Sequence, residues 1–370
     1  MTTYETKDRI AIDREVLDWI KESPWRDDET RFNALAKRIF HYQFENCKPY
    51  ARFATGRDIL PETVKQWQDI PAVPTGAFKE MTLSSFPKEE TIKIFQTSGT
   101  SSQKQGKLHL DTLMLYEASL MASLQHLLLF DLKPKKATLR ILAPSAQESP
   151  DSSLSHMFSK LMDEFGSDES DFDVVNGELK HQRLIDYLQS SELSSKPIVL
   201  CGTAFSFVHM LDALTARNLQ IACPPGSRIM ETGGFKGRSR ELTQDDLHQA
   251  LEGAFGIPRH RIVNQYGMTE LGSQFYDSVL IDPKGPRRKL VPPWVRVRFI
   301  DPETSEEVEE GQTGITSILD LSNTGSISAI QTADLGRKVH ASTPGFTILG
   351  REQGAEERGC SIAADEMLSS

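Results

Sequence analysis

The sequence lacks the features that mark several common classes of protein. Its four cysteines, Cys47, Cys201, Cys223 and Cys360, form no Cys-x-x-Cys pair, so their spacing indicates neither a zinc site nor a disulfide framework. No stretch approaches the roughly 18 consecutive apolar residues of a membrane span, and residues 1–5 lack the basic and apolar regions of a signal peptide. We therefore expect a cytoplasmic protein with reduced cysteines.

Two common nucleotide-binding fingerprints are also missing. Gly99 is not followed by Gly-Lys-Ser/Thr at the spacing of a Walker loop, and no Gly-x-Gly-x-x-Gly occurs. A net charge of -10 argues against a surface built for nucleic acid or an anionic membrane, although a few aimed donors suffice to bind phosphate. With 370 residues, 38% hydrophobic and 25% charged, the chain can form one large domain or two closely packed lobes.

The most distinctive stretch is residues 95–107, Phe-Gln-Thr-Ser-Gly-Thr-Ser-Ser-Gln-Lys-Gln-Gly-Lys. Alternating residues 91–95 before it and residues 108–110 after it predict two short strands joined by this loop. Backbone amides in a loop of small residues approach phosphate oxygens closely, and lysine adds positive charge. A solvated turn has the same composition, so the choice between the two depends on the rest of the chain.

The remaining pattern predicts an α/β fold. Apolar spacing predicts helices within residues 8–48, and helices alternate with short apolar strands from residue 111 onward. This order favours a largely parallel sheet with ligands bound at the carboxyl ends of its strands. After residue 285 the pattern changes to antiparallel hairpins, while residues 149–171 are polar and partly loop.

We divide the chain into four parts on this basis. They are a helical region packed on the core (1–90), an α/β core (91–285), a β-rich subdomain (286–349) and a short tail that carries Cys360 (350–370). We find no internal repeat.

Two stretches taken together resemble signatures of the adenylate-forming superfamily, which contains acyl-CoA ligases, peptide-synthetase adenylation domains and luciferases. They are residues 95–101 and residues 264–270, Asn-Gln-Tyr-Gly-Met-Thr-Glu. Four further matches fall in the family's order: residues 231–234, residues 301–304 with Gly311 and Gly314, residues 332–336 and residues 350–351. Six short patterns in order across about 255 residues are a far stronger signal than any one of them.

Within that superfamily the chain looks most like the LuxE-like acyl-protein synthetases of bacterial luminescence. The similarity rests on length, on residues 70–79 and on residues 358–361, Arg-Gly-Cys-Ser. It implies the adenylate-forming fold, with mixed, largely parallel sheets flanked by helices and a small antiparallel subdomain. A usual member of the superfamily continues into a lid domain with an assisting lysine, whereas this sequence stops at Ser370, so we expect the full lid to be absent.

The resemblance also implies an activity. Members of the family activate a fatty acid with ATP and Mg²⁺, load the acyl group onto their own cysteine as a thioester, and pass it to a reductase partner. Two other functions stay open. One is an acyl- or aryl-CoA or carrier-protein ligase, and the other is a non-catalytic nucleotide-binding subunit. We expect neither a nucleic-acid partner nor a membrane span.

The resemblance assigns the phosphate side of the site. Four loop residues would hold the β- and γ-phosphates of ATP: Thr97, Ser98, Gly99 and Thr100. Lys104 would assist them, although it follows Ser-Ser-Gln instead of the usual Thr-Gly-x-Pro. Thr269 would bond the α-phosphate, and Glu270 would hold Mg²⁺, a hard cation that suits carboxylate and phosphate oxygens. A carboxylate at the start of a helix is the ordinary alternative for Glu270.

The nucleoside side is assigned in the same way. The adenine would lie against Tyr266 and the backbone of Glu231, Thr232, Gly233 and Gly234. The cofactor-binding set also includes Gln265, Gly267 and Met268. Asp334 would accept hydrogen bonds from the ribose hydroxyls, with Arg351 nearby, and His156 would contact the substrate carboxylate or phosphate. The ordinary alternatives are a core tyrosine, a turn aspartate, a surface arginine and a structural histidine.

Cys360 is the expected nucleophile. The thiolate is the reactive form, and basic neighbours such as Arg358 lower the pKa of a thiol from its reference value near 8.5. Gly359 leaves room for an acyl-adenylate to approach. The alternative is an incidental exposed cysteine in the tail. Cys201 and Cys223 follow or flank apolar segments, and we expect them to be buried.

Overall fold

The computed structural model describes residues 7–97, 104–132, 136–193, 196–233, 242–351 and 367. Within these ranges the chain forms two compact units. The first unit takes in the described parts of Met1–Ala122, Met268–Gln274 and Leu290–Ser370, and the second those of Ser123–Gly267 and Phe275–Lys289. None of the helices in the described ranges is both long enough and apolar enough to cross a membrane.

The second unit is built on the parallel sheet that the sequence predicts. Its strand order is β11-β10-β9-β8-β4-β5. The strands are β4 (Thr138–Leu142), β5 (Asp171–Phe172), β8 (Ile198–Thr203), β9 (Arg228–Thr232), β10 (Ile262–Tyr266) and β11 (Phe275–Tyr276). Every neighbouring pair is parallel except β10 and β11. The carboxyl ends of β4, β8, β9 and β10 therefore point the same way.

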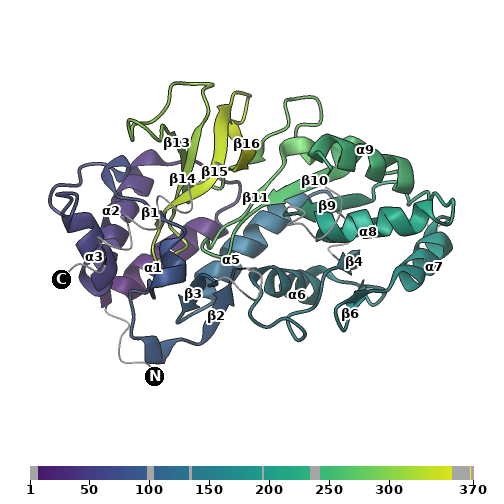
Figure 1. Ribbon diagram of the computed structural model, residues 1–370, viewed down its shortest axis with the longest axis horizontal. Coiled ribbons are helices and arrows are strands. Elements are labelled where there is room, and N and C mark those ends of the chain that lie inside the picture. The colour runs from purple at the N-terminus through teal and green to yellow at the C-terminus, as the bar shows by residue number, and fades with distance from the viewer. Residues whose placement is uncertain are drawn as a thin grey trace. The chain divides into compact units, whose positions relative to one another are not determined.

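Helices flank this sheet (Figure 1). They are α6 (Ser153–Phe165), α7 (His181–Ser191), α8 (Ala204–Thr215) and α9 (Gln244–Phe255), with a π-helix at Leu124–Leu128 and a hairpin of β6 (Val174–Val175) and β7 (Glu178–Leu179). Helix α9 begins after Thr243, whose side chain accepts a hydrogen bond from the backbone N–H of Asp246. Helix α6 occupies most of the polar stretch that was expected to be partly loop, because Ser152 caps it and its apolar residues face inward.

Helices open the first unit, as the sequence predicts. They are α1 (Lys7–Lys21), α2 (Glu29–Asn46), α3 (Lys48–Thr55), α4 (Ala77–Glu80) and α5 (Met114–Ser123). The apolar stripes are buried, with Val16 of α1 and Phe32 of α2 fully enclosed. The hairpin predicted around the polar loop is also present, since β2 (Lys93–Gln96) pairs antiparallel with β3 (Lys107–Leu110).

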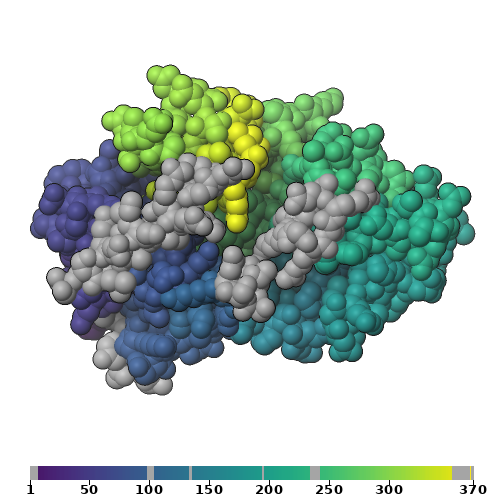
Figure 2. All heavy atoms as spheres, viewed as in Figure 1, coloured from purple at the N-terminus to yellow at the C-terminus, as the bar shows by residue number. Residues whose placement is uncertain are grey.

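An antiparallel sheet completes the first unit. Strands β13 (Val295–Ile300), β14 (Gly314–Asp320), β15 (Ala329–Val339) and β16 (Gly345–Arg351) pair in sequence, and β1 (Val73–Pro74) runs parallel to β15. The short β12 (Lys289–Leu290) spans the division between the units. The end of β16 lies at the surface, yellow in Figure 2, where Leu349 is 51% exposed.

Candidate functional site

The base of the polar loop is closed by two hydrogen bonds. The backbone N–H of Thr97 donates to the carbonyl of Gly106 at 2.9 Å, and the N–H of Gly106 donates to Oγ1 of Thr97, also at 2.9 Å. The site is tightly packed around Gly106, because a Cβ there would lie 3.2 Å from Cγ2 of Thr97 and 3.5 Å from Oε1 of Glu270. Glu270 therefore lies beside the base of the loop.

The second signature reaches this point through a turn. Thr269 Oγ1 donates to the carbonyl of Gln96 at 3.4 Å across 173 residues of sequence. Glu270 is 6% exposed and follows in the same turn, which the N–H of Leu271 closes on the carbonyl of Met268, so it is not at the start of a helix. The structure thus brings Thr97, Thr269 and Glu270 close together.

A groove of about 400 Å³ lies beside the hairpin. Gln96, Lys79, Lys104 and Lys107 are among the residues that line it. Lys104 Nζ lies 2.7 Å from Oε2 of Glu80, and its side chain is 61% exposed. The groove therefore offers cationic side chains close to the base of the loop.

Asp334 and Arg351 face each other across two strands. They are register partners in β15 and β16, and Nε of Arg351 lies 3.1 Å from Oδ1 of Asp334. Asp334 lies within β15, so it belongs to a strand and not to a turn, and its N–H donates to Oγ1 of Thr332 at 3.0 Å. The Arg351 side chain is 69% exposed. The two residues are neighbours, as expected.

The residues of the second unit that the resemblance assigns to the nucleoside lie at the carboxyl ends of β9 and β10. Thr232 and Gln265 are register partners, and Oγ1 of Thr232 donates to the carbonyl of Gln265 at 3.1 Å. Tyr266 is half-buried and packs against Phe275, with 6.0 Å between ring centroids. Gly233 has a φ of +78°, a conformation that glycine adopts without strain.

The Glu231 side chain is buried and hydrogen-bonded to other residues of the second unit. It is 2% exposed, its Oε1 accepts a hydrogen bond from Nδ2 of Asn264 at 2.7 Å, and Nε2 of His248 lies 2.9 Å away. Nζ of Lys289 donates to the Asn264 carbonyl at 2.8 Å and lies 2.8 Å from Oδ1 of Asp277. This buried network holds the first residues of the 264–270 signature in place.

Sequence reasoning missed most of this network. Asn264 belongs to a signature but received no role, and Lys289 ends a basic run, Arg-Arg-Lys, of a kind typical of a solvated surface. His248 gave a usable signal, because it is a polar residue beside Leu247 on the buried side of α9.

Several predicted residues lie outside the described parts of the chain: Ser98, Gly99, Thr100, Gly234 and Cys360. His156 lies in the first turns of α6 and is half-buried. In the ranges that the structure describes, no three His, Cys, Asp or Glu side chains are grouped to hold a metal ion.

The three cysteines that the structure does describe are poor nucleophiles. Burial raises the pKa of Cys47 to about 11 and that of Cys201 and Cys223 to about 12, so little thiolate exists at neutral pH. Cys201 is fully buried, as expected, whereas Cys223 is half-buried.

Comparison with known proteins gives relatives along the whole chain. The "Long-chain-fatty-acid--luciferin-component ligase" of Aliivibrio fischeri is 24% identical and the match covers 99% of this chain and 97% of the relative. The protein of the same name from Vibrio harveyi is also 24% identical, over 98% of this chain and 96% of its own.

Solved structures confirm the predicted fold. An open conformation of 2-hydroxyisobutyryl-CoA ligase in complex with 2-HIB-AMP and CoA superposes with a TM-score of 0.63 at 15% identity, over 90% of this chain and 80% of that one. The family described as "Acyl-protein synthetase, LuxE" matches residues 1–369. The chain therefore belongs to the LuxE family of acyl-protein synthetases, which are ligases with the fold of adenylate-forming enzymes.

Proposed function

We propose that this chain activates a long-chain fatty acid with ATP, takes the acyl group onto Cys360 as a thioester, and transfers it to a protein partner such as an acyl reductase. The observation that carries the proposal is the meeting of Thr97, Thr269 and Glu270 at the base of the β2–β3 loop. The names of the relatives supply the long-chain fatty acid.

In the first step a carboxylate oxygen attacks the α-phosphorus of ATP and pyrophosphate leaves. Negative charge grows on the phosphoryl oxygens, so catalysis consists mainly of positioning and electrostatic stabilisation. We assign the β- and γ-phosphates to the loop that begins at Thr97, with Lys104 beside it, and the α-phosphate to Thr269. A hydroxyl donor and a surface lysine suit these tasks because both can reorient when the nucleotide arrives.

The donor set fits Mg²⁺ bound together with ATP. Glu270 provides one carboxylate, and Mg²⁺ is usually held by one or two carboxylates plus phosphate oxygens and water. When bound, the ion would neutralise charge on the phosphate oxygens. The Glu270 backbone carbonyl accepts a hydrogen bond from Nδ2 of Asn323 at 2.8 Å.

We assign the nucleoside to Tyr266, Gly233 and the ends of β9 and β10, and the ribose hydroxyls to Asp334. In the structure the Asp334 carboxylate is paired with Arg351, whose exposed side chain can move aside at low cost. We assign His156, which is half-buried, to the substrate carboxylate or phosphate.

In the second step the Cys360 thiolate attacks the acyl carbonyl of the adenylate and AMP leaves. Two points support Cys360: it stands in the family's Arg-Gly-Cys-Ser stretch, and burial raises the pKa of each cysteine in the described ranges. An acid ligase that uses coenzyme A or a carrier protein as acceptor is the second candidate, because its adenylation site would have the same residues. A non-catalytic nucleotide-binding subunit is the third.

Self-labelling tests the thioester. The protein is incubated with ATP, Mg²⁺ and labelled fatty acid, denatured, and treated with hydroxylamine, with Cys360→Ser beside the wild type and Cys223→Ser as the control. We expect hydroxylamine-sensitive label on the wild type and on Cys223→Ser, and none on Cys360→Ser. Label that stays on Cys360→Ser would sink the assignment.

Pyrophosphate exchange separates the three functions. We expect acid-dependent exchange in the wild type and a loss of at least tenfold in Glu270→Ala. Exchange without self-labelling would favour an external acceptor. No exchange with any acid would favour the non-catalytic subunit.

A further inference from the structure

The loop between β14 and β15 is polar and yet buried. Its members are between 0 and 6% exposed: Ser322, Asn323, Thr324, Ser326 and Ser328. Polar groups removed from water cost free energy unless they are hydrogen-bonded, so the partners of this loop show what it holds.

On one side the loop holds the chain that carries Glu270. Nδ2 of Asn323 donates to the carbonyls of Glu270 at 2.8 Å and Ile327 at 2.9 Å. The segment that carries Glu270 contacts the loop again three residues further on, where Oγ of Ser273 lies 3.1 Å from Oγ of Ser322. A Cβ on Gly272 would lie 2.4 Å from that Ser322 oxygen, so the backbone rests directly against the loop.

On the other side the loop is held by helix α2. Gln43 is fully buried, and its Nε2 donates to the carbonyls of Asn323 at 2.9 Å and Thr324 at 3.2 Å. Its Oε1 accepts from the N–H and hydroxyl of Ser328 at 3.1 and 3.0 Å. Both ends of one amide thus fix the loop from which the Asn323 side chain projects.

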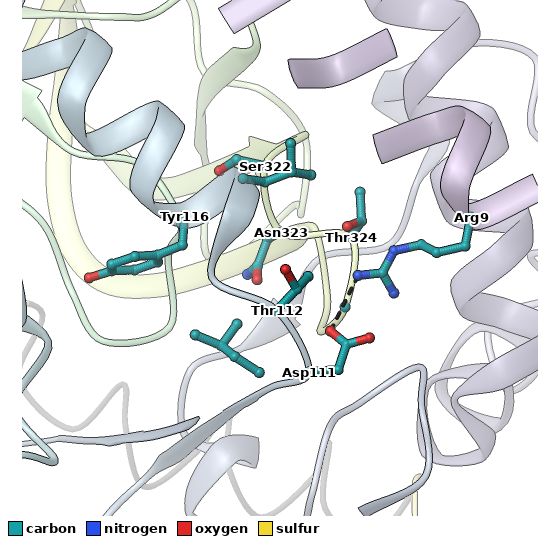
Figure 3. A pocket seen from close by; sticks show the side chains of 11 residues that line it. Arg9, Asp111, Thr112, Tyr116, Ser322, Asn323 and Thr324 are labelled. Atoms are coloured by element: carbon teal, nitrogen blue, oxygen red, sulfur yellow. Dashed lines mark hydrogen bonds and ion pairs between the residues drawn. The ribbon is translucent and has the colours of Figure 1, made fainter. Parts of the chain in front are cut away.

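A small cavity leaves little freedom on the remaining side. Asn323 and Thr324 line it together with Arg9 and Asp111 (Figure 3). Nη2 of Arg9 lies 3.4 Å from Oδ1 of Asp111. Its volume of about 10 Å³ holds at most one water. A Cβ on Gly325 would lie 2.9 Å from Oδ1 of Asp111, so the loop fits closely against the pair.

We propose that Asn323, fixed by Gln43, is a positioning residue that sets where the Glu270 carboxylate stands for the metal of the metal–ATP complex. The proposal rests on the metal role proposed for Glu270. Mg²⁺ demands near-ideal octahedral geometry with ligands at about 2.0–2.1 Å, so a backbone shift of a few tenths of an ångström at Glu270 weakens its binding. Asn323 itself touches the Glu270 carbonyl and not the metal.

The test measures binding and not turnover. The dissociation constant of a non-hydrolysable ATP analogue is determined by calorimetry with and without Mg²⁺, and the ratio of the two gives the enhancement due to the metal. We expect Asn323→Ala to reduce this enhancement about tenfold, as is typical for partners of a metal ligand, and to leave metal-free binding unchanged. Glu270→Gln should reduce it at least as much.

Ser326→Ala is the matched control. Ser326 is as buried as Asn323 and donates to the carbonyl of Leu83 at 2.7 Å, away from Glu270. We expect it to lower the melting temperature and to keep the full enhancement. If Ser326→Ala loses the enhancement as Asn323→Ala does, the loop has only a structural role and the proposal is overturned.

The remaining outcomes separate the two proposals. If Glu270→Gln loses the enhancement and Asn323→Ala keeps it, the positioning role is wrong and the metal role stands. If Glu270→Gln keeps it, both are wrong. Should Asn323→Ala fail to fold, Gln43→Met leaves Asn323 in place and removes its support; we expect about a threefold loss of enhancement, and no loss overturns the proposal.

Discussion

The 264–270 signature belongs to both units, and its two halves are held by different chemistry. In the second unit Asn264 is bonded by charged groups, since its side chain donates to Glu231 and its carbonyl accepts from Lys289. In the first unit the Glu270 carbonyl is bonded by the neutral amide of Asn323. The first arrangement depends on balanced charge, whereas the second depends on hydrogen bonds alone.

Two buried aspartates make the difference measurable. Burial by itself would raise the pKa of Asp277, but Lys289 and Arg287 outweigh burial and hold that pKa below its ordinary value of 3.8. Burial raises the pKa of Asp320 above 3.8, because the hydrogen bonds from Ser322 and Ser273 do not offset the loss of water. Full opposite charges are therefore needed to keep a buried carboxylate ionised at little cost.

The largest effect is expected from breaking the charged half. Lys289→Ala leaves the Asp277 carboxylate, which is 2% exposed, without one of its two cations, and removes the donor to the Asn264 carbonyl. Removing one partner of a buried ion pair costs about 3 kcal/mol or more of folding free energy. Urea unfolding at pH 7 measures it, with the exposed Lys284→Ala as control. A loss as small as that of the control would show that Arg287 alone balances Asp277.

The two aspartates should respond to pH in opposite directions. The depressed pKa of Asp277 contributes stability that is present above pH 3.8 and is lost as the pH falls through the folded-state value. The raised pKa of Asp320 contributes stability that is present below pH 3.8 and is lost as the pH rises through the folded-state value.

Urea unfolding between about pH 2 and pH 8 tests this contrast, because the Asp277 effect falls below pH 3.8 and the Asp320 effect above it. Relative to the wild type, Asp320→Asn should become more stable as the pH rises, by on the order of 1 kcal/mol, because it removes a buried charge and keeps one acceptor oxygen. Asp277→Asn should lose its disadvantage as the pH falls. Parallel pH profiles for the two variants would contradict the assignment of charge to the two halves.

The contrast also explains how far the sequence could predict this protein. Apolar periodicity predicted the parallel sheet, the hairpin around the polar loop and the antiparallel hairpins after residue 285. The reason is that the apolar runs of β4 and β8 and the alternation in β13 can be recognised in the local sequence. The order of short signatures predicted that Thr97, Thr269 and Glu270 belong together, and the structure places them close to one another. These are local patterns, and a single sequence is enough to recognise them.

The supports of the site are not local. Gln43 reaches Asn323 across 280 residues, and Lys289 reaches Asn264 across 25. An isolated glutamine in an amphipathic helix or a lysine in a basic run carries no sign that it is buried. Such residues become visible only when the fold has brought their partners to them, so the side chains that hold a site are harder to predict than those that define it.

The smallest effect on folding is expected at Lys104, which belongs to neither buried network. Its ion pair with Glu80 is largely exposed, with side chains 61% and 41% accessible, and such pairs contribute about 0–1 kcal/mol. Lys104→Ala should therefore leave urea unfolding nearly unchanged. In pyrophosphate exchange it should raise the KM for ATP about threefold to tenfold, because a phosphate contact is lost. Lys196→Ala, which removes an exposed ion pair with Glu169, is the control for both measurements. A phosphate-binding lysine requires a weakly bound partner, because the nucleotide has to displace Glu80 from Lys104. An unchanged KM for ATP would mean that Lys104 stays paired with Glu80 during the reaction.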